Sequence, residues 1–190
     1  MVELIVDDIM SKVSDHRAHV LMLKEKGGLR RIIVALGLLE AQAIVFALRR
    51  VDTERPLTHD LFGSVMGAFG IALEHVLIND ISDGTFRAVL HCSQGGEAKD
   101  VDARTSDAVA LALRAGVPIY IEDELLNRMC VRSETNGAIS IPITAADEGT
   151  LRTALENAVK EENYELALKL KEEIDSRHQA VPEPGEDKTE

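Results

Sequence analysis

The densest chemistry in the chain lies at residues 102–108, DARTSDA, which place two carboxylates, one guanidinium and two hydroxyls between an expected strand and an expected helix. Asp102 and Asp107 can accept protons or bind a cation through oxygen, and Arg104 presents a donor fork that fits phosphate or carboxylate. Residues 109–116 favour a helix that ends at a glycine. Thr105 or Ser106 is expected to be its N-cap, and such a concentration of polar groups is typical of a functional site.

A second group of reactive side chains opens another expected helix. Pro56 disfavours helix before it, Thr58 is expected to be the N-cap, and Leu61, Val65 and Phe69 follow at four-residue spacing. His59 then lies at the helix start, and imidazole is the side chain that exchanges protons near neutral pH. Asp60 beside it is a second carboxylate.

The elements that must position these groups alternate between strand and helix patterns. Residues 17–23 and 30–36 are expected to form neighbouring strands, and residues 37–50 an apolar helix with Glu40 in its first turn. Around Asp83-Gly84 a hairpin over 75–92 pairs Ser82 with Thr85, Ile81 with Phe86 and Asp80 with Arg87. With a strand at 117–121 and a short hairpin through Asn136-Gly137, the pattern predicts an α+β fold, a mixed β-sheet with packed helices.

The C-terminal part has a different composition. Leu151, Leu155 and Val159, and then Leu166, Leu170 and Ile174, recur at four-residue spacing on either side of Glu161-Glu162-Asn163. Such stripes predict a small C-terminal helical hairpin. Residues 179–190, rich in charge and proline, are expected to form a disordered acidic tail.

Charge and composition restrict the function further. The net charge is −12, of which residues 147–190 carry −7 (13 acidic and 6 basic residues), leaving −5 on the rest. This balance argues against coating nucleic acid by electrostatics alone. Phosphate contacts would need metal ions or a local basic patch, such as Lys24, Lys26, Arg30 and Arg31, or Arg49 and Arg50. Aromatic residues make up only 3% of the chain, so base stacking has few side chains available.

Cysteine spacing and the N-terminal segment indicate the compartment. Cys92 and Cys130 lie far apart without metal-binding spacing, so reduced thiols are expected. Residues 1–8 lack a basic region followed by a long apolar run, and no window reaches the length of a membrane span. A cytoplasmic protein without membrane contact is therefore expected.

Four segments, in order along the chain, resemble a known family. Residues 40–44 (EAQAI), 55–60 (RPLTHD), 83–86 (DGTF) and 102–108 (DARTSDA) are similar to the bifunctional nuclease domain of bacteria and plants. The resemblance covers about residues 1–135. It implies a compact α+β domain, a homo-oligomer, and nuclease activity on both RNA and DNA with little sequence preference.

The C-terminal stripes resemble a second motif. Residues 151–174 are similar to the UVR motif, a helical hairpin that binds proteins, with the turn Glu-Asn-Tyr-Glu-Leu-Ala as its signature. We expect the hairpin at 148–178, after a linker or short strand region at 136–147, and a possible protein partner through it.

Hydrolysis of a phosphodiester needs an activated water and stabilisation of the charge that grows on phosphate. The sequence therefore predicts three roles for side chains that share one cavity: catalysis, metal binding and binding of the substrate's phosphate. Catalysis is assigned to His59, Asp60, Asp102 and Asp107; a Mg²⁺ or Mn²⁺ ion to Glu40, Asp60, Asp102 and Asp107; and substrate binding to Arg55, Arg104, Thr58 and Ser106.

A structural interpretation of the same residues stays open. Glu40, Asp60 and Asp107 each fall in a first helical turn, where the helix dipole favours a carboxylate, and Arg55 and Arg104 could be their ion-pair partners. On that view the chain is a non-enzymatic oligomeric adaptor whose hairpin recruits a protein. The sequence thus supports two functions, a divalent-metal-assisted nuclease of RNA and DNA and this adaptor.

Overall fold

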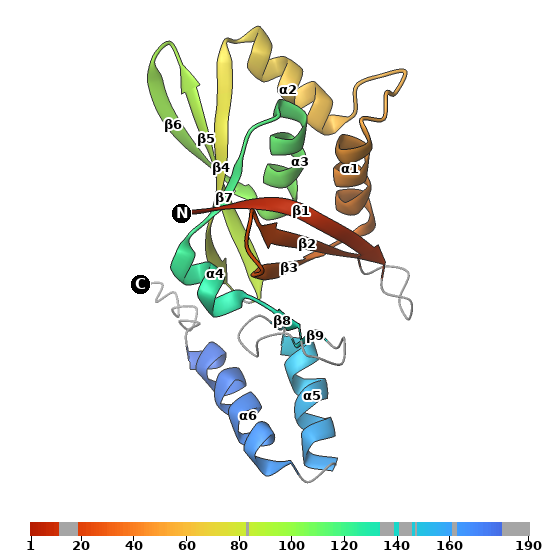
Figure 1. The fold of residues 1–190 in the computed structure, drawn as a ribbon, viewed down its shortest axis with the longest axis vertical. Coiled ribbons are helices and arrows are strands. Elements are labelled where there is room, and N and C mark those ends of the chain that lie inside the picture. The colour runs from red at the N-terminus through yellow and green to blue at the C-terminus, as the bar shows by residue number, and fades with distance from the viewer. Residues whose placement is uncertain are drawn as a thin grey trace, which may run out of the picture. The chain divides into compact units, whose positions relative to one another are not determined.

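A computed structural model describes residues 1–11, 19–82, 84–133, 139–140, 146, 148–160 and 163–179. The chain divides into two compact units, Met1–Ile141 and Pro142–Glu190. The first unit contains both groups of candidate site residues, and the second contains the C-terminal helices (Figure 1).

The first unit is built on a seven-stranded mixed sheet with the order β3-β2-β1-β7-β4-β5-β6. The contact of β4 with β7 is parallel and the other contacts between neighbours are antiparallel. The bounds of the strands are β1 Val2–Ser11, β2 His19–Glu25, β3 Arg31–Leu36, β4 Ile71–Ser82, β5 Thr85–Gln94, β6 Glu97–Arg104 and β7 Ile119–Ile121.

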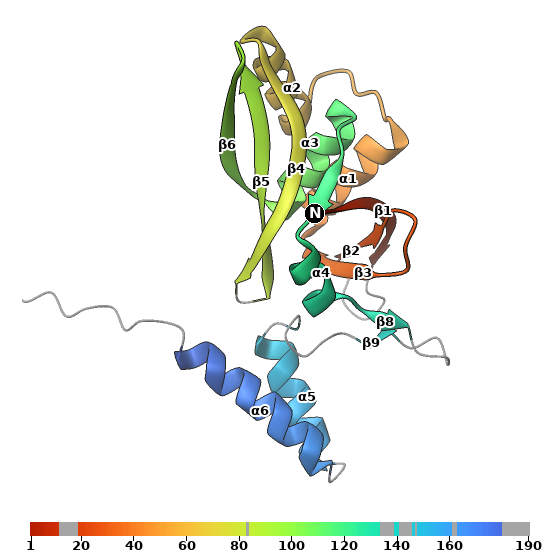
Figure 2. The ribbon, with the colours of Figure 1, turned by 60° about the vertical axis from the view of Figure 1, so that its left-hand side comes forward.

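Three helices pack against one face of this sheet (Figure 2). They are α1 (Leu38–Arg49), α2 (Thr58–Ala68) and α3 (Thr105–Ala115), and α3 contacts both of the others. A short helix, α4 (Asp123–Met129), follows β7, and the two-residue strands β8 (Arg132–Ser133) and β9 (Ile139–Ser140) pair beyond it. This confirms the α+β class and the mixed sheet.

The strand register explains which face is buried. Leu4, Ile119, Val76 and Leu90 are neighbours across β1, β7, β4 and β5, and all four are almost fully buried. Side chains alternate between the two faces of a strand, so this row marks the helix-covered face. The adjacent row, Glu3, Tyr120, Leu77, Val89 and Asp102, lies on the opposite face.

α3 is the central helix because its sequence is small and apolar on several sides. Its residues from Ala108 to Ala112 are all buried, and the helix contacts β4, β5, α1 and α2. It ends at Gly116, which adopts φ +69°, as the sequence predicts. Both ends of this buried helix therefore have fixed positions, and the residues in its terminal turns are held with them.

The strand pairing of β4 with β5 is also as predicted. Ser82 pairs with Thr85, Ile81 with Phe86, and Asp80 with Arg87. Asp83, in the turn itself, lies outside the described residues. Strands at 19–25 and 31–36, the helix at 38–49 and the strand at 119–121 agree with expectation, whereas β1 and α4 were not expected from the sequence.

Both predicted N-caps were wrong by one or two positions. Leu57, not Thr58, is the N-cap of α2, and its backbone N–H donates to Asp60 Oδ2 at 3.0 Å. Arg104 is the N-cap of α3, so Thr105 and Ser106 are already helical. Instead of capping, the Thr105 hydroxyl donates to the carbonyl of Phe86 at 2.8 Å and the residue is 2% exposed. At α2 the carboxylate of Asp60, the third helical residue, accepts a hydrogen bond from the backbone N–H of the N-cap residue. At α3 the N-cap residue, Arg104, makes no side-chain capping bond.

The second unit contains two helices, α5 (Glu148–Lys160) and α6 (Tyr164–Gln179), which pack on each other. Their buried cluster is formed by Leu151, Ala158, Ala167, Leu170 and Ile174. The expected helical hairpin is thus present, and its resemblance to the UVR motif stays a prediction. The rest of the predicted tail, residues 180–190, lies outside the described part of the chain.

Two further expectations concern thiols and membranes. Cys92 and Cys130 are free thiols. Among the helices within the described residues, none combines the length and the apolar character that crossing a bilayer requires.

The Thr105 hydroxyl should matter for stability because it satisfies a buried carbonyl. We expect Thr105→Val, which preserves the shape, to lower the free energy of unfolding by about 1–3 kcal/mol, because the Phe86 carbonyl loses its donor. Urea denaturation measures this difference. Ser106→Ala at the next position is the control and should change the free energy by less than about 0.5 kcal/mol. Equal effects of both substitutions would contradict this assignment.

Candidate active site

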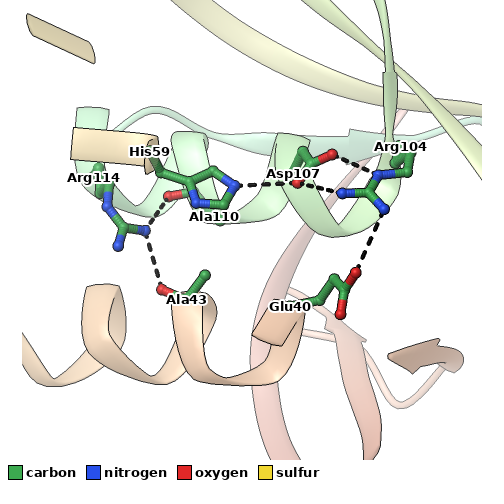
Figure 3. Close-up of polar contacts among 7 residues, drawn as sticks. All are labelled: Glu40, Ala43, His59, Arg104, Asp107, Ala110 and Arg114. Atoms are coloured by element: carbon green, nitrogen blue, oxygen red, sulfur yellow. Dashed lines mark hydrogen bonds and ion pairs between the residues drawn. The ribbon is translucent and has the colours of Figure 1, made fainter. Parts of the chain in front are cut away.

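The starts of α2 and α3 bring together side chains from two of the predicted groups (Figure 3). His59 Nε2 lies 3.1 Å from Asp107 Oδ1. Arg104 Nε donates to Asp107 Oδ2 at 2.7 Å, and its Nη2 donates to Oδ1 at 3.2 Å. Asp107 is therefore held between an imidazole and a two-pronged guanidinium. We call His59, Asp107, Arg104 and Glu40 the polar cluster.

Glu40 joins the polar cluster from α1. Its Oε1 lies 3.4 Å from Arg104 Nη1, so one guanidinium faces two carboxylates. Its carboxylate folds back over Gly37, where a Cβ would lie 2.5 Å from Glu40 Oε2. A glycine before α1 thus leaves the space that this carboxylate occupies.

The local structure explains why these residues meet. Arg104 is the last residue of β6 and the N-cap of α3, and Asp107 follows in the first turn, three positions later. His59 is the second residue of α2, and α2 packs on α3. Two helix starts that lie side by side therefore supply the acid, the base and the cation.

The protonation of Asp107 follows from its partners. Burial raises the pKa of this carboxyl, but hydrogen bonds from Arg104 and His59 more than offset that effect and hold the pKa below its usual range. Asp107 raises the pKa of Arg104 in return. Near neutral pH the carboxylate is ionised and can only accept hydrogen bonds.

An ionised Asp107 also determines the tautomer of His59. Since the carboxylate only accepts, Nε2 of the imidazole must donate, which leaves the lone pair of neutral His59 on Nδ1. Within the described contacts Nδ1 makes no hydrogen bond. His59 is thus oriented as a base that can take one proton.

Arg114 is a positioning residue of this site that the sequence analysis missed. Its Nε donates to Asp60 Oδ1 at 2.5 Å, and its Nη1 donates to the carbonyls of Ala43 at 3.1 Å and Ala110 at 3.0 Å. One largely buried guanidinium therefore connects α1, α2 and α3. A basic residue in the last turn of a helix is a common dipole partner, so the sequence signalled nothing more.

The contacts of Asp60 are made within the helix layer. The hydrogen bond from Arg114 lowers the pKa of its carboxyl, and the N–H of Leu57 lowers it further. With both oxygens engaged, Asp60 fixes the start of α2 and places the neighbouring His59. These contacts suit a positioning residue, and the roles in catalysis and metal binding predicted for Asp60 stay predictions.

Two cavities flank the polar cluster. One of about 440 Å³ is lined by His59, Asp60 and Arg114, by the glycine face of α2, and by apolar side chains of β4 and α3. We call it the α2–α3 cavity. The other, of about 200 Å³, is lined by Glu40, Arg104 and Ser106 with residues 34–37 and 84–86. The polar cluster contributes to both cavities.

Asp102 is not brought to the polar cluster. It pairs with Val89 in register and belongs to the row on the sheet face opposite to the three helices. The same face carries a hydrogen-bonded pair, His91 Nδ1 and Asp100 Oδ1, 2.6 Å apart. Asp102 thus lies on the uncovered face of β6 and Asp107 in the first turn of α3, so the structure separates the two aspartates that the sequence placed together.

The remaining predicted residues are Arg55, Thr58 and Ser106, and the described contacts join none of them to the polar cluster. Arg55 and Thr58 are exposed at the start of α2. Ser106, in the first turn of α3, lines the 200 Å³ cavity. The alternative in which Arg55 pairs with a first-turn acid finds no support among the described ion pairs, where Arg104 and Arg114 take that role.

The donor set does not fit the predicted Mg²⁺ or Mn²⁺ site. Asp60 is paired with Arg114, Asp102 lies on the other sheet face, and Glu40 and Asp107 both face Arg104. Among the described residues no three His, Cys, Asp or Glu side chains are grouped so as to hold a metal ion. The carboxylates of the polar cluster are neutralised by guanidinium groups instead.

Three of the four cations of the first predicted basic patch form ion pairs, Lys24 being the fourth. Lys26 pairs with Glu3, Arg31 with Asp7, and Arg30 with Glu25 and Asp123. These cations stabilise the β2–β3 region rather than presenting a free positive surface. Arg49 and Arg50, at the end of α1, are exposed.

Comparison with known proteins gives three findings. A family model described as the bifunctional nuclease domain matches residues 21–134. A protein of Mycobacterium tuberculosis (strain ATCC 25618 / H37Rv), described as uncharacterized, is 38% identical over 157 residues, which are 83% of this chain and 84% of that protein. Bifunctional nuclease 1 and bifunctional nuclease 2 of Arabidopsis thaliana are each 27% identical, over 70% and 74% of this chain but only 41% and 43% of their own length.

The lowered pKa values of Asp60 and Asp107 predict acid sensitivity. Both carboxyls bind protons less readily when folded, so their stabilising contribution is present above about pH 4 and is lost as pH falls through the folded values. We therefore expect Asp60→Asn to be less stable than the wild type at pH 7, with a difference that shrinks below about pH 4. Urea unfolding at pH 3, 5 and 7 measures it.

Asp102→Asn is the matched control for this pH series. It removes a carboxylate from the same unit, on a sheet face where no guanidinium binds it among the described contacts. Its stability should follow the wild type at each pH. A constant deficit of Asp60→Asn at all three pH values would contradict the assignment of its ion pair with Arg114.

Proposed function

Since the chain belongs to the bifunctional nuclease domain family, we propose that it hydrolyses phosphodiester bonds of RNA and DNA with little sequence preference. The observation that carries this proposal is the polar cluster, in which an oriented base and an exposed guanidinium lie between two cavities. A purely structural network would not need an unpaired base nitrogen beside open volume.

His59 is proposed as the general base. Its Nδ1 takes a proton from a water molecule, and the resulting hydroxide attacks phosphorus while the bond to the leaving oxygen breaks. Asp107 accepts from Nε2 and stabilises the imidazolium that forms. The products are one phosphate end and one hydroxyl end, and His59 returns its proton to the leaving oxygen or to solvent.

Arg104 is proposed to stabilise the charge on phosphate. Its guanidinium is the most exposed member of the polar cluster, with 68% of the side chain accessible, and its fork geometry suits phosphate oxygens. Ser106 and the free amides at the start of α3 are additional donors at the same place. Arg55, which precedes α2, and Thr58, its first residue, are both exposed and are proposed to contact flanking phosphates.

No step of this mechanism uses a metal ion, because the described carboxylates do not fit one. Divalent-metal assistance by Mg²⁺ or Mn²⁺, which the sequence predicted, is therefore assigned to no residue. Cleavage assays in Mg²⁺, Mn²⁺ or chelator decide whether activity depends on such an ion.

A second proposed function concerns the C-terminal hairpin. Tyr164 and Leu168 on α6 lie one turn apart and are largely exposed, so the hairpin retains an apolar surface after its own core is formed. Such a surface suits a helical partner, as proposed for the UVR-like residues 148–178. If the chain is an adaptor alone, replacing Tyr164 and Leu168 abolishes partner binding. In that case neither the wild type nor any variant cleaves nucleic acid.

The proposed base predicts a specific loss of activity. We expect His59→Ala to lower kcat for cleavage of end-labelled RNA and single-stranded DNA by about 10²–10⁴-fold, the usual contribution of a general base. Asp107→Asn should produce a comparable loss, because the amide can no longer orient and stabilise the imidazole as a carboxylate does. Purified full-length protein and gel quantification of products measure both.

His75→Gln is the matched control for His59→Ala, because His75 lies on the opposite sheet face and stacks on His91 at 4.2 Å. It should retain the activity of the wild type, and circular dichroism should show that all variants are folded. Equal cleavage by His59→Ala and the wild type would exclude His59 as the base. No cleavage by the wild type in any buffer would favour the adaptor.

The α2–α3 cavity predicts opposite effects on stability and on substrate binding. Gly63 lines this cavity within α2, and a Cβ built on it meets no atom within 4 Å. Gly63→Ala should stabilise the protein by about 0.5–1 kcal/mol through helix propensity. Gly63→Leu should fill part of the cavity and raise KM for RNA at least several-fold if nucleotides enter it.

Gly149→Ala is the control, since it adds to an exposed helical glycine of α5 the same methyl group that Gly63→Ala adds to α2. It should leave KM unchanged. Urea unfolding and steady-state kinetics on all three variants provide the test. An unchanged KM in Gly63→Leu would mean that the substrate does not use this cavity.

A further inference from the structure

The proposed reaction gives no role to Glu40, the fourth member of the polar cluster. Figure 3 shows Asp107 and Glu40 at two different edges of the Arg104 guanidinium. The distance from Glu40 Oε1 to Arg104 Nη1 is 3.4 Å, whereas Asp107 Oδ2 lies 2.7 Å from Arg104 Nε. Within the described part of the chain no hydrogen bond reaches Glu40 Oε2. The carboxylate of Glu40 is therefore weakly held and has lone pairs left for a ligand.

Glu40 lines the cavity of about 200 Å³ beside the polar cluster. The other polar side chains of this lining are those of Arg104, Thr85, Thr105 and Ser106, so Glu40 is the single carboxylate among the described residues there. The volume is several times the roughly 30 Å³ that one water molecule occupies in the liquid, which leaves room for a group as large as a sugar.

The proposed phosphate site borders the same cavity. Arg104 and Ser106, the side chains proposed to bind phosphate at the start of α3, are part of the cavity lining. Glu40 contacts Arg104, and a sugar is joined directly to its phosphate. A phosphate on the Arg104 guanidinium therefore brings the sugar of the same nucleotide within reach of the Glu40 carboxylate.

Inside a strand, the sugar–phosphate backbone of DNA offers a carboxylate nothing to bind. Phosphate oxygens and the ring and ester oxygens of the sugar only accept hydrogen bonds, and so does an ionised carboxylate. The 2′-hydroxyl of RNA donates as well as accepts, and DNA lacks this group. A carboxylate beside a bound phosphate can therefore gain a hydrogen bond from the backbone of RNA but not from that of DNA.

We propose that Glu40 accepts a hydrogen bond from the 2′-hydroxyl of the nucleotide whose phosphate Arg104 binds, so that the site prefers RNA to DNA. This inference rests on the proposed function, which supplies the position of the phosphate. Donors on the bases differ from one base to the next, so they suit a site of little sequence preference less well than a hydroxyl that every ribonucleotide carries.

Binding of oligouridylate and oligodeoxyuridylate, which differ only in the 2′-hydroxyl, tests the inference. Full-length protein carrying His59→Ala, which should block cleavage, is titrated into each labelled oligonucleotide, and fluorescence anisotropy gives the dissociation constant. We expect the ribose form to bind at least about ten-fold more tightly, the usual effect of one hydrogen bond to a charged group. The 2′-fluoro form, which cannot donate a hydrogen bond, should bind like the deoxy form.

Two substitutions of Glu40 separate the acceptor from the shape of the side chain. Glu40→Met keeps a similar length without the oxygens and should bring the ratio of RNA affinity to DNA affinity close to one. Glu40→Gln retains an acceptor oxygen and should keep the ratio within about three-fold of its parent. Asp102→Asn is the matched control, because it removes a carboxylate from the opposite sheet face and should leave the ratio unchanged. Circular dichroism checks that each variant is folded.

Three results would overturn the inference: equal affinity for the ribose and deoxy forms, binding of the 2′-fluoro form as tight as that of RNA, or an RNA preference that survives Glu40→Met. Failure of the proposed function is a different result, the absence of cleavage by the wild type. Binding of RNA through Glu40 without cleavage would exclude the nuclease and leave this recognition in place. Absence of binding to every oligonucleotide would overturn both.

Discussion

The ion pair between Arg104 and Asp107 is the interaction on which the candidate active site depends. It joins the end of β6 to the first turn of α3, and through Glu40 and His59 it also fixes the starts of α1 and α2. α3 can hold these groups because its middle is a buried stretch of small apolar side chains that leaves both ends fixed. At the other end Arg114 connects the same three helices, so two guanidinium groups bracket the helix layer.

This arrangement makes two roles compatible in one network. Asp60 and Arg114 are largely structural. Asp60 accepts hydrogen bonds from Leu57 and Arg114, so protein groups occupy both of its oxygens. Asp107 is satisfied as well, but its partners differ in exposure: His59 is mostly buried, whereas most of the Arg104 side chain is accessible. The buried His59 therefore has a fixed position beside Asp107, whereas the exposed Arg104 can exchange its carboxylate partner for a phosphate of the substrate.

Much of the fold could be predicted from the sequence, because the signals were local. The Asp83-Gly84 turn determined the register of β4 and β5, and Gly116 determined the end of α3. The site was harder, because it depends on strand alternation and long-range pairing. Asp102 and Asp107 are five positions apart, but one belongs to the uncovered face of β6 and the other to a helix. Arg114 and Asp60, 54 positions apart, meet only through helix packing.

In the proposed reaction the charges of the polar cluster must rearrange as the substrate binds. An arriving phosphate competes with Asp107 and Glu40 for the exposed guanidinium of Arg104. The fork of N–H donors fits a phosphate as well as it fits a carboxylate. When Arg104 turns toward phosphate, Asp107 keeps its hydrogen bond with His59 and loses its competing cation. Its charge then stabilises the imidazolium that forms on proton transfer. Substrate binding would therefore leave the Asp107 carboxylate to His59 alone, and in this way an acidic chain could act on a polyanion without a basic surface.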